Sequence, residues 1–346
     1  MNQSVIFAMA AAVLFGASTP LAKMLIGEVS PVLLSGLLYF GSGVGLGLFR
    51  ILRDKGWHSS GIQASEWSWF AGSIFFGGIS APVALMYGLT MTSGSAASLM
   101  LNLESVLTAV LAWVVFKEHA DKRIVMGMVA IVAGGVMLSW QPGDAGSSSW
   151  MGFGAIALAC LCWAIDNNLT RKVSASDAVF IASSKGLLAG IVNCTAALTW
   201  GANVPDTQTT LLAMMVGLLG YGVSLVFFVL ALRGLGAART GAYFSTAPFV
   251  GSAVSLVLFR ETAGTAFWMA CALMAIGVWL HLTEIHEHEH SHEPVAHSHA
   301  HTHDEHHRHP HDVAVDMTEP HVHLHRHASI SHKHPHYPDI HHQHLH

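Results

Sequence analysis

Ionisable side chains are rare within the long apolar runs of this sequence, so the few that occur there are the first candidates for chemistry. Glu104 lies about nine residues into an apolar run from Ala96 to Phe116. A charged group at the centre of a hydrocarbon layer costs about 3 kcal/mol even on mild scales, so Glu104 must face a cavity or a partner. Loss of water favours the protonated carboxyl and suits it to exchange a proton. We predict that Glu104 binds substrate or a proton, with a structural hydrogen-bonding role as the alternative.

Three more polar residues accompany Glu104 in the same run. Asn102 lies four positions after Ser98 and three before Ser105. Residues at these spacings share one face of a helix. This polar face is predicted either to line the same cavity as Glu104 or to form a seam between packed helices, and the sequence leaves both interpretations open.

A second polar cluster occurs later in the chain. Asp166, Asn167 and Asn168 are consecutive, and Lys185 lies in the next apolar run. At 1.5 Å per residue, Asp166 and Lys185 reach nearly the same depth, and consecutive helices are commonly neighbours. We predict an ion pair between them. The alternative is a cation site made of Asp166 and the two amides, with Lys185 acting as a gate.

The C-terminal segment from Glu284 to His346 has a different composition, with 23 of the 26 histidines. It has almost no large apolar residues to bury, so we expect it to be disordered without a ligand. Its histidines often alternate with other residues, and alternating imidazoles suit nickel, cobalt, zinc or copper. The predicted metal ligands are His286, His288, His290, His292, His297, His299, His301, His303, His321, His323, His325 and His327.

Two other interpretations of this histidine-rich tail were considered. An expression tag would be a short uninterrupted run, whereas no more than two histidines are adjacent here. A polycation that responds to pH is the remaining alternative to metal binding. No metal or other cofactor is expected to be required by the rest of the chain.

The composition of the chain is that of an integral membrane protein. Charged residues make up 11% of the sequence and apolar residues 52%, against about 25% charged in soluble domains. The four cysteines, Cys160, Cys162, Cys194 and Cys271, all lie in apolar runs, so we interpret them as buried thiols rather than disulfides or a soft-metal site. There is no phosphate-binding loop and no nucleophile with a base, so an enzyme or an ATP-driven pump is not predicted.

Ten apolar runs are long enough to cross a hydrocarbon layer of about 30 Å as helices. They are 5–25, 32–49, 69–89, 96–116, 124–140, 152–169, 179–200, 211–232, 240–259 and 266–282, with a polar break from Gln141 to Ser149. We therefore predict an all-α membrane protein of ten spans. Residues 1–140 and 150–283 would form two five-helix repeats, and 284–346 a cytoplasmic tail.

The two halves share features in the same order. Leu89, Val114, Phe116 and Glu118 recur 143 positions later, and five spans per half force the two copies into opposite orientations in the membrane. Between the first and sixth spans, Ser18 and Thr19 correspond to Asp166 and Asn167. Ser18 and Thr19 are therefore second-rank candidates for the same pathway.

Basic residues in the short loops predict the orientation. Ten of them fall on one side and only Lys23 and Arg260 on the other. The positive-inside rule places the basic side in the cytoplasm. We expect both termini, and the tail, to be cytoplasmic in a protein of the inner membrane.

These features together resemble the EamA-type carriers of the drug/metabolite transporter superfamily over residues 4 to 282. The resemblance rests on Leu103-Glu104-Ser105, Ala-Leu-Arg-Gly-Leu-Gly-Ala-Ala at 231–238, Pro248, Lys117-Glu118 and Arg260-Glu261. It implies ten spans and secondary transport, commonly export, of small solutes. The family often has Leu-Glu-Pro in the fourth and ninth helices. Here Glu104 lacks that proline and Pro248 follows Ala247, so the resemblance implies no two-glutamate site.

Three functions remain open from the sequence: an exporter of transition-metal ions, an exporter of amino acids or other organic metabolites whose tail only buffers or senses metal, and a membrane-anchored metal store. A store needs no charge inside the membrane, which argues against the third. We favour metal export narrowly, because the tail lies on the side from which an exporter loads. The expected partners are the lipid bilayer and a small solute or metal ion, with a homodimer allowed and no nucleic acid.

Overall fold

The computed structural model describes residues 3–54, 60–116, 122–139, 149–173, 176–282, 287–292, 296–301, 321–326 and 330–335. The chain divides into a helical unit that ends at Glu284 and a C-terminal tail unit. Each unit is considered by itself.

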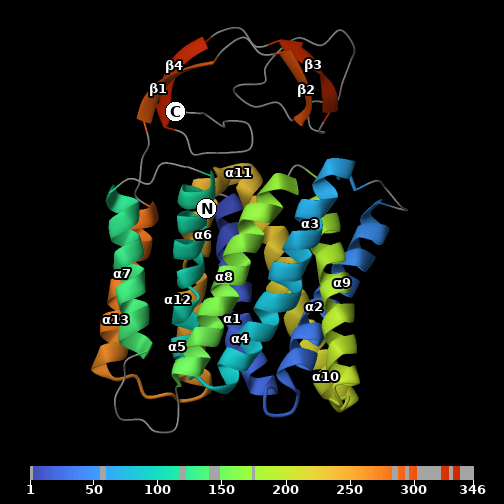
Figure 1. Ribbon diagram of the computed structural model, residues 1–346, viewed down its shortest axis with the longest axis vertical. Helices are drawn as coiled ribbons and strands as arrows, with labels where there is room; N and C mark the ends of the chain where they lie inside the picture. The colour runs from blue at the N-terminus through green and yellow to red at the C-terminus, as the bar shows by residue number, and fades with distance from the viewer. Residues whose placement is uncertain are drawn as a thin grey trace. The chain divides into compact units, whose positions relative to one another are not determined.

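The helical unit is a bundle of long apolar helices (Figure 1). Its α-helices are α1 (Gln3–Leu25), α2 (Pro31–Asp54), α3 (Trp67–Ser73), α4 (Ala81–Thr90), α5 (Gly94–Met100), α6 (Leu103–Phe116), α7 (Lys122–Ser139), α8 (Trp150–Val173), α9 (Ala178–Thr199), α10 (Thr207–Gly217), α11 (Ser224–Phe244), α12 (Ala247–Leu258) and α13 (Thr265–Leu282). A short 3₁₀ turn, η1 (Ala64–Glu66), precedes α3. Two π-helical segments, η2 (Ile74–Ser80) and η3 (Leu218–Val223), join α3 to α4 and α10 to α11.

Eight helical stretches among the described residues are long and apolar enough to cross a membrane. Two shorter apolar helices, Ala247–Leu258 and Thr265–Leu280, follow them. The chain is therefore a multi-pass membrane protein, as its composition predicts. The predicted polar break lies mostly outside the described residues.

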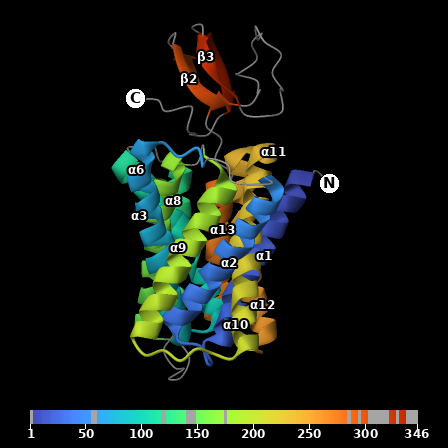
Figure 2. The same ribbon diagram turned by 90° about the vertical axis from the view of Figure 1, so that its right-hand side faces the viewer.

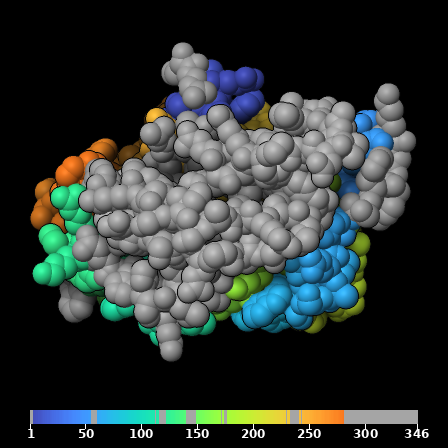
Figure 3. Space-filling view, turned by 90° about the horizontal axis from the view of Figure 1, so that it is seen from above, coloured from blue at the N-terminus to red at the C-terminus, as the bar shows by residue number. Residues whose placement is uncertain are grey.

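The helices pack in pairs that join the first half of the helical unit to the second. At one edge α7 lies against α13, and at the other α2 lies against α9 (Figures 1 and 2). Seen from above, the ends of α7 and α13 lie at the edge opposite the end of α3 (Figure 3). Between the edges, α1 contacts α11 and α12, whereas α8 contacts α4 and α6.

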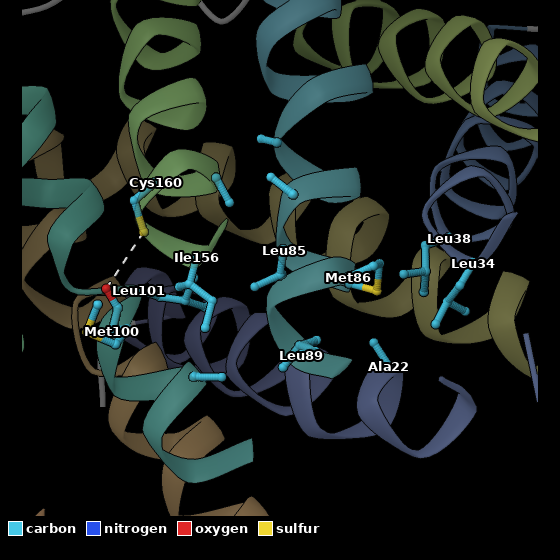
Figure 4. Packing of buried hydrophobic residues seen from close by; sticks show 14 of the residues in the cluster. Ala22, Leu34, Leu38, Leu85, Met86, Leu89, Met100, Leu101, Ile156 and Cys160 are labelled. Atoms are coloured by element: carbon cyan, nitrogen blue, oxygen red, sulfur yellow. Dashed lines mark hydrogen bonds between the residues drawn. The ribbon is translucent and has the colours of Figure 1, made fainter. Parts of the chain in front are cut away.

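The interior of the bundle is an apolar cluster centred on α4. Leu85 and Met86 are fully buried between α2 and α8, where Leu34 and Ile156 meet them (Figure 4). The buried thiol of Cys160 points toward the carbonyl oxygen of Met100 at 3.7 Å. No disulfide joins the four cysteines, and Cys160 and Cys162 are buried as small apolar groups.

The fourth predicted span is present as the stretch Gly94–Val115, but it is not one regular helix. The helix breaks at Leu101–Asn102, between α5 and α6, and a matching break at Ser245–Thr246 separates α11 from α12. The backbone tightens at the first break, where the amides of Leu101 and Asn102 donate to carbonyls only three residues back. Side-chain hydrogen bonds from Asn102 to Leu99 O, 2.9 Å, and from Ser105 to Asn102 O, 2.7 Å, occupy carbonyls near the break. These local hydrogen bonds compete with the regular helix.

Two further boundaries differ from the prediction. Helix α11 continues across residues 233–239, where the sequence predicted a loop between the eighth and ninth spans. The third and eighth spans each contain a π-helical segment. Hydropathy alone cannot distinguish an α-helix from a π-helical segment, because in both the backbone N–H and C=O groups are hydrogen-bonded within the segment.

Hydrogen bonds between loops define the two ends of the helical unit. At one end, called the Asp177 end, Arg50 donates to Asp177 at 2.9 Å, and the Asp177 amide donates to Ser60 O. The opposite end, called the Glu261 end, contains the turns after α1, α4, α9 and α12. There the Ser149 amide donates to Met91 O at 2.9 Å.

We expect the Asp177 end to lose stability in acid. Burial alone would raise the pKa of Asp177, but hydrogen bonds from Arg50 and from the amides of Val179 and Phe180 outweigh it and lower that pKa below 3.8. Because the folded protein lowers the pKa, the stabilisation is complete above about pH 4 and is lost as the pH falls through the lowered value. Thermal unfolding in detergent, from about pH 5 to about pH 2, measures this loss.

The variant Asp177→Asn should unfold with a smaller pH dependence and be about 1 to 3 kcal/mol less stable at neutral pH. Glu66→Gln is the control and should leave the acid profile unchanged, because Glu66 accepts from one backbone amide, that of Gln63 at 2.9 Å, in an exposed turn. An unchanged acid profile in Asp177→Asn would contradict the expectation.

The tail unit contains four short strands, β1 (Glu287–His292), β2 (Ala296–His301), β3 (His321–Arg326) and β4 (Ile330–Pro335). Strand β1 pairs antiparallel with β4, and β2 pairs antiparallel with β3. The all-helical fold expected of the membrane part is confirmed, and the disorder expected for the tail without a ligand stays a prediction. Alternating histidines have the period of two that a strand has, and a two-stranded ladder needs no apolar core to satisfy its backbone.

Candidate functional site

A pocket of about 460 Å³ lies where the two broken helices meet α1 and α8. Its volume is within the range of pockets for small organic ligands. The lining residues are Phe15, Leu101, Asn102, Glu104, Ser105, Thr108, Ala109, Asn167, Asn168, Gly241, Phe244, Ser245, Ala247 and Pro248. Both helix breaks, Leu101–Asn102 and part of Ser245–Thr246, are therefore in the lining.

Glu104 is the acidic residue of this lining, and it lies in the first turn of α6. The Asn167 side-chain amide donates to Glu104 Oε1 at 2.8 Å and approaches Thr108 Oγ1 at 3.4 Å. A charge-assisted hydrogen bond of this kind fixes the direction of the carboxylate. The first turn of a helix also favours a negative charge. Glu104 is thus held in the pocket with a neutral partner rather than a cationic one.

The other amides of the pocket use their N–H groups to support the backbone around it. Asn168 donates to Ala164 O at 2.8 Å and to Thr108 O at 3.5 Å. Asn102, buried to 3% exposure, donates to Leu99 O. The contact of Asn168 with Thr108 joins α8 to α6, whereas the other two are local to one helical segment.

The predicted ion pair between Asp166 and Lys185 is present. Lys185 Nζ lies 2.5 Å and 2.6 Å from the two carboxylate oxygens, and Thr170 donates to Asp166 Oδ1 at 2.8 Å. Both residues lie outside the pocket lining, on α8 and α9 beside it. A Cβ atom at Gly77 of η2 would collide with the Asp166 carboxylate, so the lack of a side chain at this glycine gives the carboxylate its space. A role for this pair in the transport pathway stays a prediction.

Ser18 and Thr19 do not join Glu104 at the pocket. Both are 2% exposed, and Ser18 donates to Phe15 O at 2.6 Å on its own helix. Ser18 packs against Gly220 of η3, as Asp166 packs against Gly77 of η2. The correspondence between Ser18 and Asp166 is therefore one of position and packing.

The pocket also contains residues that the sequence analysis did not select. Thr108 lies one turn after Glu104, a spacing that could have identified it. Ser245 lies 143 positions after Asn102 and could have been found from the repeat. Phe15 and Phe244 have no such signal, because an aromatic residue in an apolar helix is ordinary.

A metal site within the helical unit finds no support. The described residues contain no group of three or more His, Cys, Asp or Glu side chains placed to hold a metal ion. Among the predicted tail ligands, His286, His303 and His327 lie outside the described residues. The other nine lie in strands β1, β2 and β3.

Comparisons with known proteins bear on this arrangement. The model of the EamA-like transporter family matches residues 2–140 and 150–283. An uncharacterized transporter of Methanothermobacter thermautotrophicus is 24% identical over 286 residues, which cover 78% of this chain and 83% of that protein. A protein of known crystal structure aligns with a TM-score of 0.59 and 20% identity over 80% of this chain and 94% of the other. That last likeness is one of fold alone.

Proposed function

Because this chain belongs to the EamA-like transporter family, we propose that it is a secondary active transporter for a small organic solute with a cationic group. The solute binds in the pocket with its cationic group at Glu104. No step of this transport requires a metal or other cofactor.

The chemistry of the pocket lining is the observation that carries this proposal. Phe15, Leu101, Phe244 and Pro248 offer apolar surface, and Glu104 offers a carboxylate whose partner is the neutral Asn167. Nickel, cobalt and zinc are usually held by His, Cys and carboxylate groups, and the described lining provides one carboxylate with neutral amide and hydroxyl groups and no His or Cys. The preference for metal that the sequence suggested therefore finds no support in this pocket.

We further propose that the helices form ten spans in two inverted five-helix repeats. The reciprocal packing supports this, since α1 contacts η3 and α12 while α8 contacts η2 and α6. Equivalent helices also pair across the halves, as α2 does with α9 and α7 with α13. The two helix breaks lie 144 positions apart, within one residue of the spacing of the repeat. In such transporters, broken helices near mid-membrane form the substrate site.

Export is the direction that we propose, from the cytoplasm across the cell's inner membrane. Arg50, Arg53 and Lys172 lie toward the Asp177 end, whereas Lys23 and Arg260 lie toward the Glu261 end. The positive-inside rule then places the Asp177 end in the cytoplasm. Helix α6 runs from the break toward that end, so the pocket lies on the cytoplasmic side of the break. A reporter fused after Leu282 should give a cytoplasmic signal, and a periplasmic one would reverse the orientation.

Export of divalent nickel, cobalt or zinc is the second candidate function. The observation that favours it is the histidine content of the tail, which would collect metal at the cytoplasmic mouth. Imidazole binds metal only when neutral, so such a tail loads near neutral pH and releases metal as the pH falls toward about 5.

Transport in vesicles of purified protein distinguishes the two functions. We expect saturable movement of one or more members of a panel of amines and cationic amino acids, and loss of that movement in Glu104→Gln. Movement of nickel, cobalt or zinc with no organic substrate in the panel would overturn the proposal in favour of metal export.

Ending the chain at Thr283 tests the role of the tail. We expect the shortened protein to transport the organic solute with unchanged KM and maximal rate, because the pocket residues all remain. Its capacity to bind nickel in equilibrium dialysis should fall to that of the helical unit. If the tail instead supplies metal for transport, the apparent KM for metal should rise while the maximal rate stays the same.

A further inference from the structure

Lys23 joins the end of α1 to the end of α4. Its ammonium group donates to Leu89 O at 2.8 Å and to Thr92 O at 2.6 Å. These carbonyls belong to the last turn of α4 and the turn after it, where helix carbonyls lack partners within the helix. A cation at the C-terminal end of a helix also interacts favourably with the helix dipole.

Glu261 makes the complementary contact to the next helix. Its two carboxylate oxygens accept from the amides of Gly94 at 2.8 Å and Ser95 at 3.1 Å, the first two residues of α5. Arg260, directly before it, has a φ of 50°, and among the described residues only Arg260 and two glycines have positive φ. The turn after α12 is thus held in an unfavourable backbone conformation that directs Glu261 back to α5.

The helices that these two residues join also close the Glu261 side of the pocket. Gly16 of α1 lies against Ala247 and Gly251 of α12, and Gly251 lies against the Ser98 hydroxyl of α5. These contacts lie next to the pocket. Of its lining residues, Phe15 precedes Gly16, Asn102 follows Ser98 by four positions, and Ala247 is itself one of the contacting residues. A Cβ atom at Gly16 would lie 2.3 Å from Ala247 O, and one at Gly251 would lie 2.9 Å from Ser98 Oγ, so α1, α5 and α12 pack closely here.

We infer that Lys23 and Glu261, with the backbone of residues 89–95 that they bind, form a latch that closes the pocket toward the Glu261 end. Release of the latch lets α1 and α12 move away from α5 and exposes the pocket on that side. The inference rests on the proposed alternating access of the transporter and adds the residues that control one of its two states.

The surroundings of the latch suit a contact that opens and closes. Lys23 and Glu261 are both partly exposed, so water can replace their protein partners when they separate. The ion pair of Asp166 and Lys185 is buried, with side-chain exposures of 10% and 15%, and its separation would leave charges unpaired. The latch is therefore the contact that can part at low cost.

An unsatisfied hydroxyl lies beside the latch. Ser255 of α12 is fully buried, and its Oγ has no hydrogen-bond partner among the described residues. A Cβ atom at Gly94 would come within 2.8 Å of this oxygen, so the hydroxyl lies against the start of α5. Closure thus leaves a polar group without a partner, which opening would hydrate. The closed state is held against this cost by the two charged residues.

Thiol labelling of a cysteine beneath the latch tests the inference without any substrate. The reporter is Ser98→Cys in a chain whose four cysteines are replaced by alanine. A membrane-impermeant maleimide is applied separately from each side, using vesicles of known orientation. The change Glu261→Gln should raise the labelling rate from the Glu261 side about tenfold and leave labelling from the Asp177 side slow, because the buried Ser98 lies on the Glu261 side of the helix break.

Two further variants complete the experiment. Glu66→Gln is the matched control, since Glu66 also accepts from a backbone amide, that of Gln63 at 2.9 Å, in an exposed turn outside the latch. Ser255→Ala removes the unsatisfied hydroxyl and should slow labelling from the Glu261 side. Equal acceleration from both sides in Glu261→Gln would show general loosening and overturn the latch, as would no change. Either result would overturn the latch alone, because the proposed substrate class is tested separately by the vesicle transport experiment.

Discussion

Transport falls at least about tenfold when Glu104 is replaced by glutamine, while the protein still folds and inserts. Glutamine keeps the shape of the side chain and removes its charge. The Asn167 amide, 2.8 Å from the carboxylate, would then contact a neutral amide instead. The cationic group of the substrate loses its counter-charge in a pocket whose lining has no second carboxylate among the described residues. Initial rates in vesicles, at saturating and limiting solute, measure the effect.

The pH profile of transport separates binding from a merely structural role. If Glu104 exchanges a proton with substrate, Glu104→Gln should also lose most of the pH dependence seen in the unchanged protein. Glu66→Gln, which removes an exposed carboxylate outside the pocket, should transport normally. Full transport with an unchanged pH profile in Glu104→Gln would contradict the assignment of the pocket as the substrate site.

Replacing Asp166 with asparagine should destabilise the protein by about 3 to 5 kcal/mol. The change leaves the ammonium group of Lys185 buried without its carboxylate, at a side-chain exposure of 15%. Asparagine keeps one carbonyl oxygen, which Thr170 and Lys185 would have to share as acceptor. Thermal unfolding in detergent and the yield of folded protein in the membrane are the measurements.

The double variant Asp166→Asn with Lys185→Met decides what the ion pair does. Removing both charges should recover most of the stability lost in Asp166→Asn, because no unpaired charge remains. If the pair is only structural, transport should recover together with stability. Recovered stability without recovered transport would place the pair in the transport pathway. No recovery of either would contradict the view that the unpaired charge causes the defect.

The spans of the fold could be predicted because each is a long run of apolar residues. The break at Leu101–Asn102 could not, since no proline or glycine lies there. It depends on hydrogen bonds from Asn102 and Ser105 to nearby carbonyls, and the same side chains would fit an unbroken helix. Similarly, the π-helical form of η2, whose Gly77 lies against Asp166, is not visible in hydropathy.

Part of the candidate site could also be predicted from the sequence. Glu104 and Asn167 were selected because polar groups in apolar runs are costly, and the structure joins them by a hydrogen bond. The depth argument correctly paired Asp166 with Lys185. It could not tell that this pair lies beside the pocket rather than in its lining, because depth along a helix does not determine the direction that a side chain faces.

The break between α5 and α6 also affects how the chain is made. With 7 residues, α5 is about 10 Å long, and α6, with 14, is about 21 Å. Neither could cross about 30 Å of hydrocarbon alone. The two must therefore cross together, as the 22-residue stretch Gly94–Val115. Helices α8 and α12, which pack against α6 and α5, are synthesised later, so this part of the pocket matures only after translation has passed both.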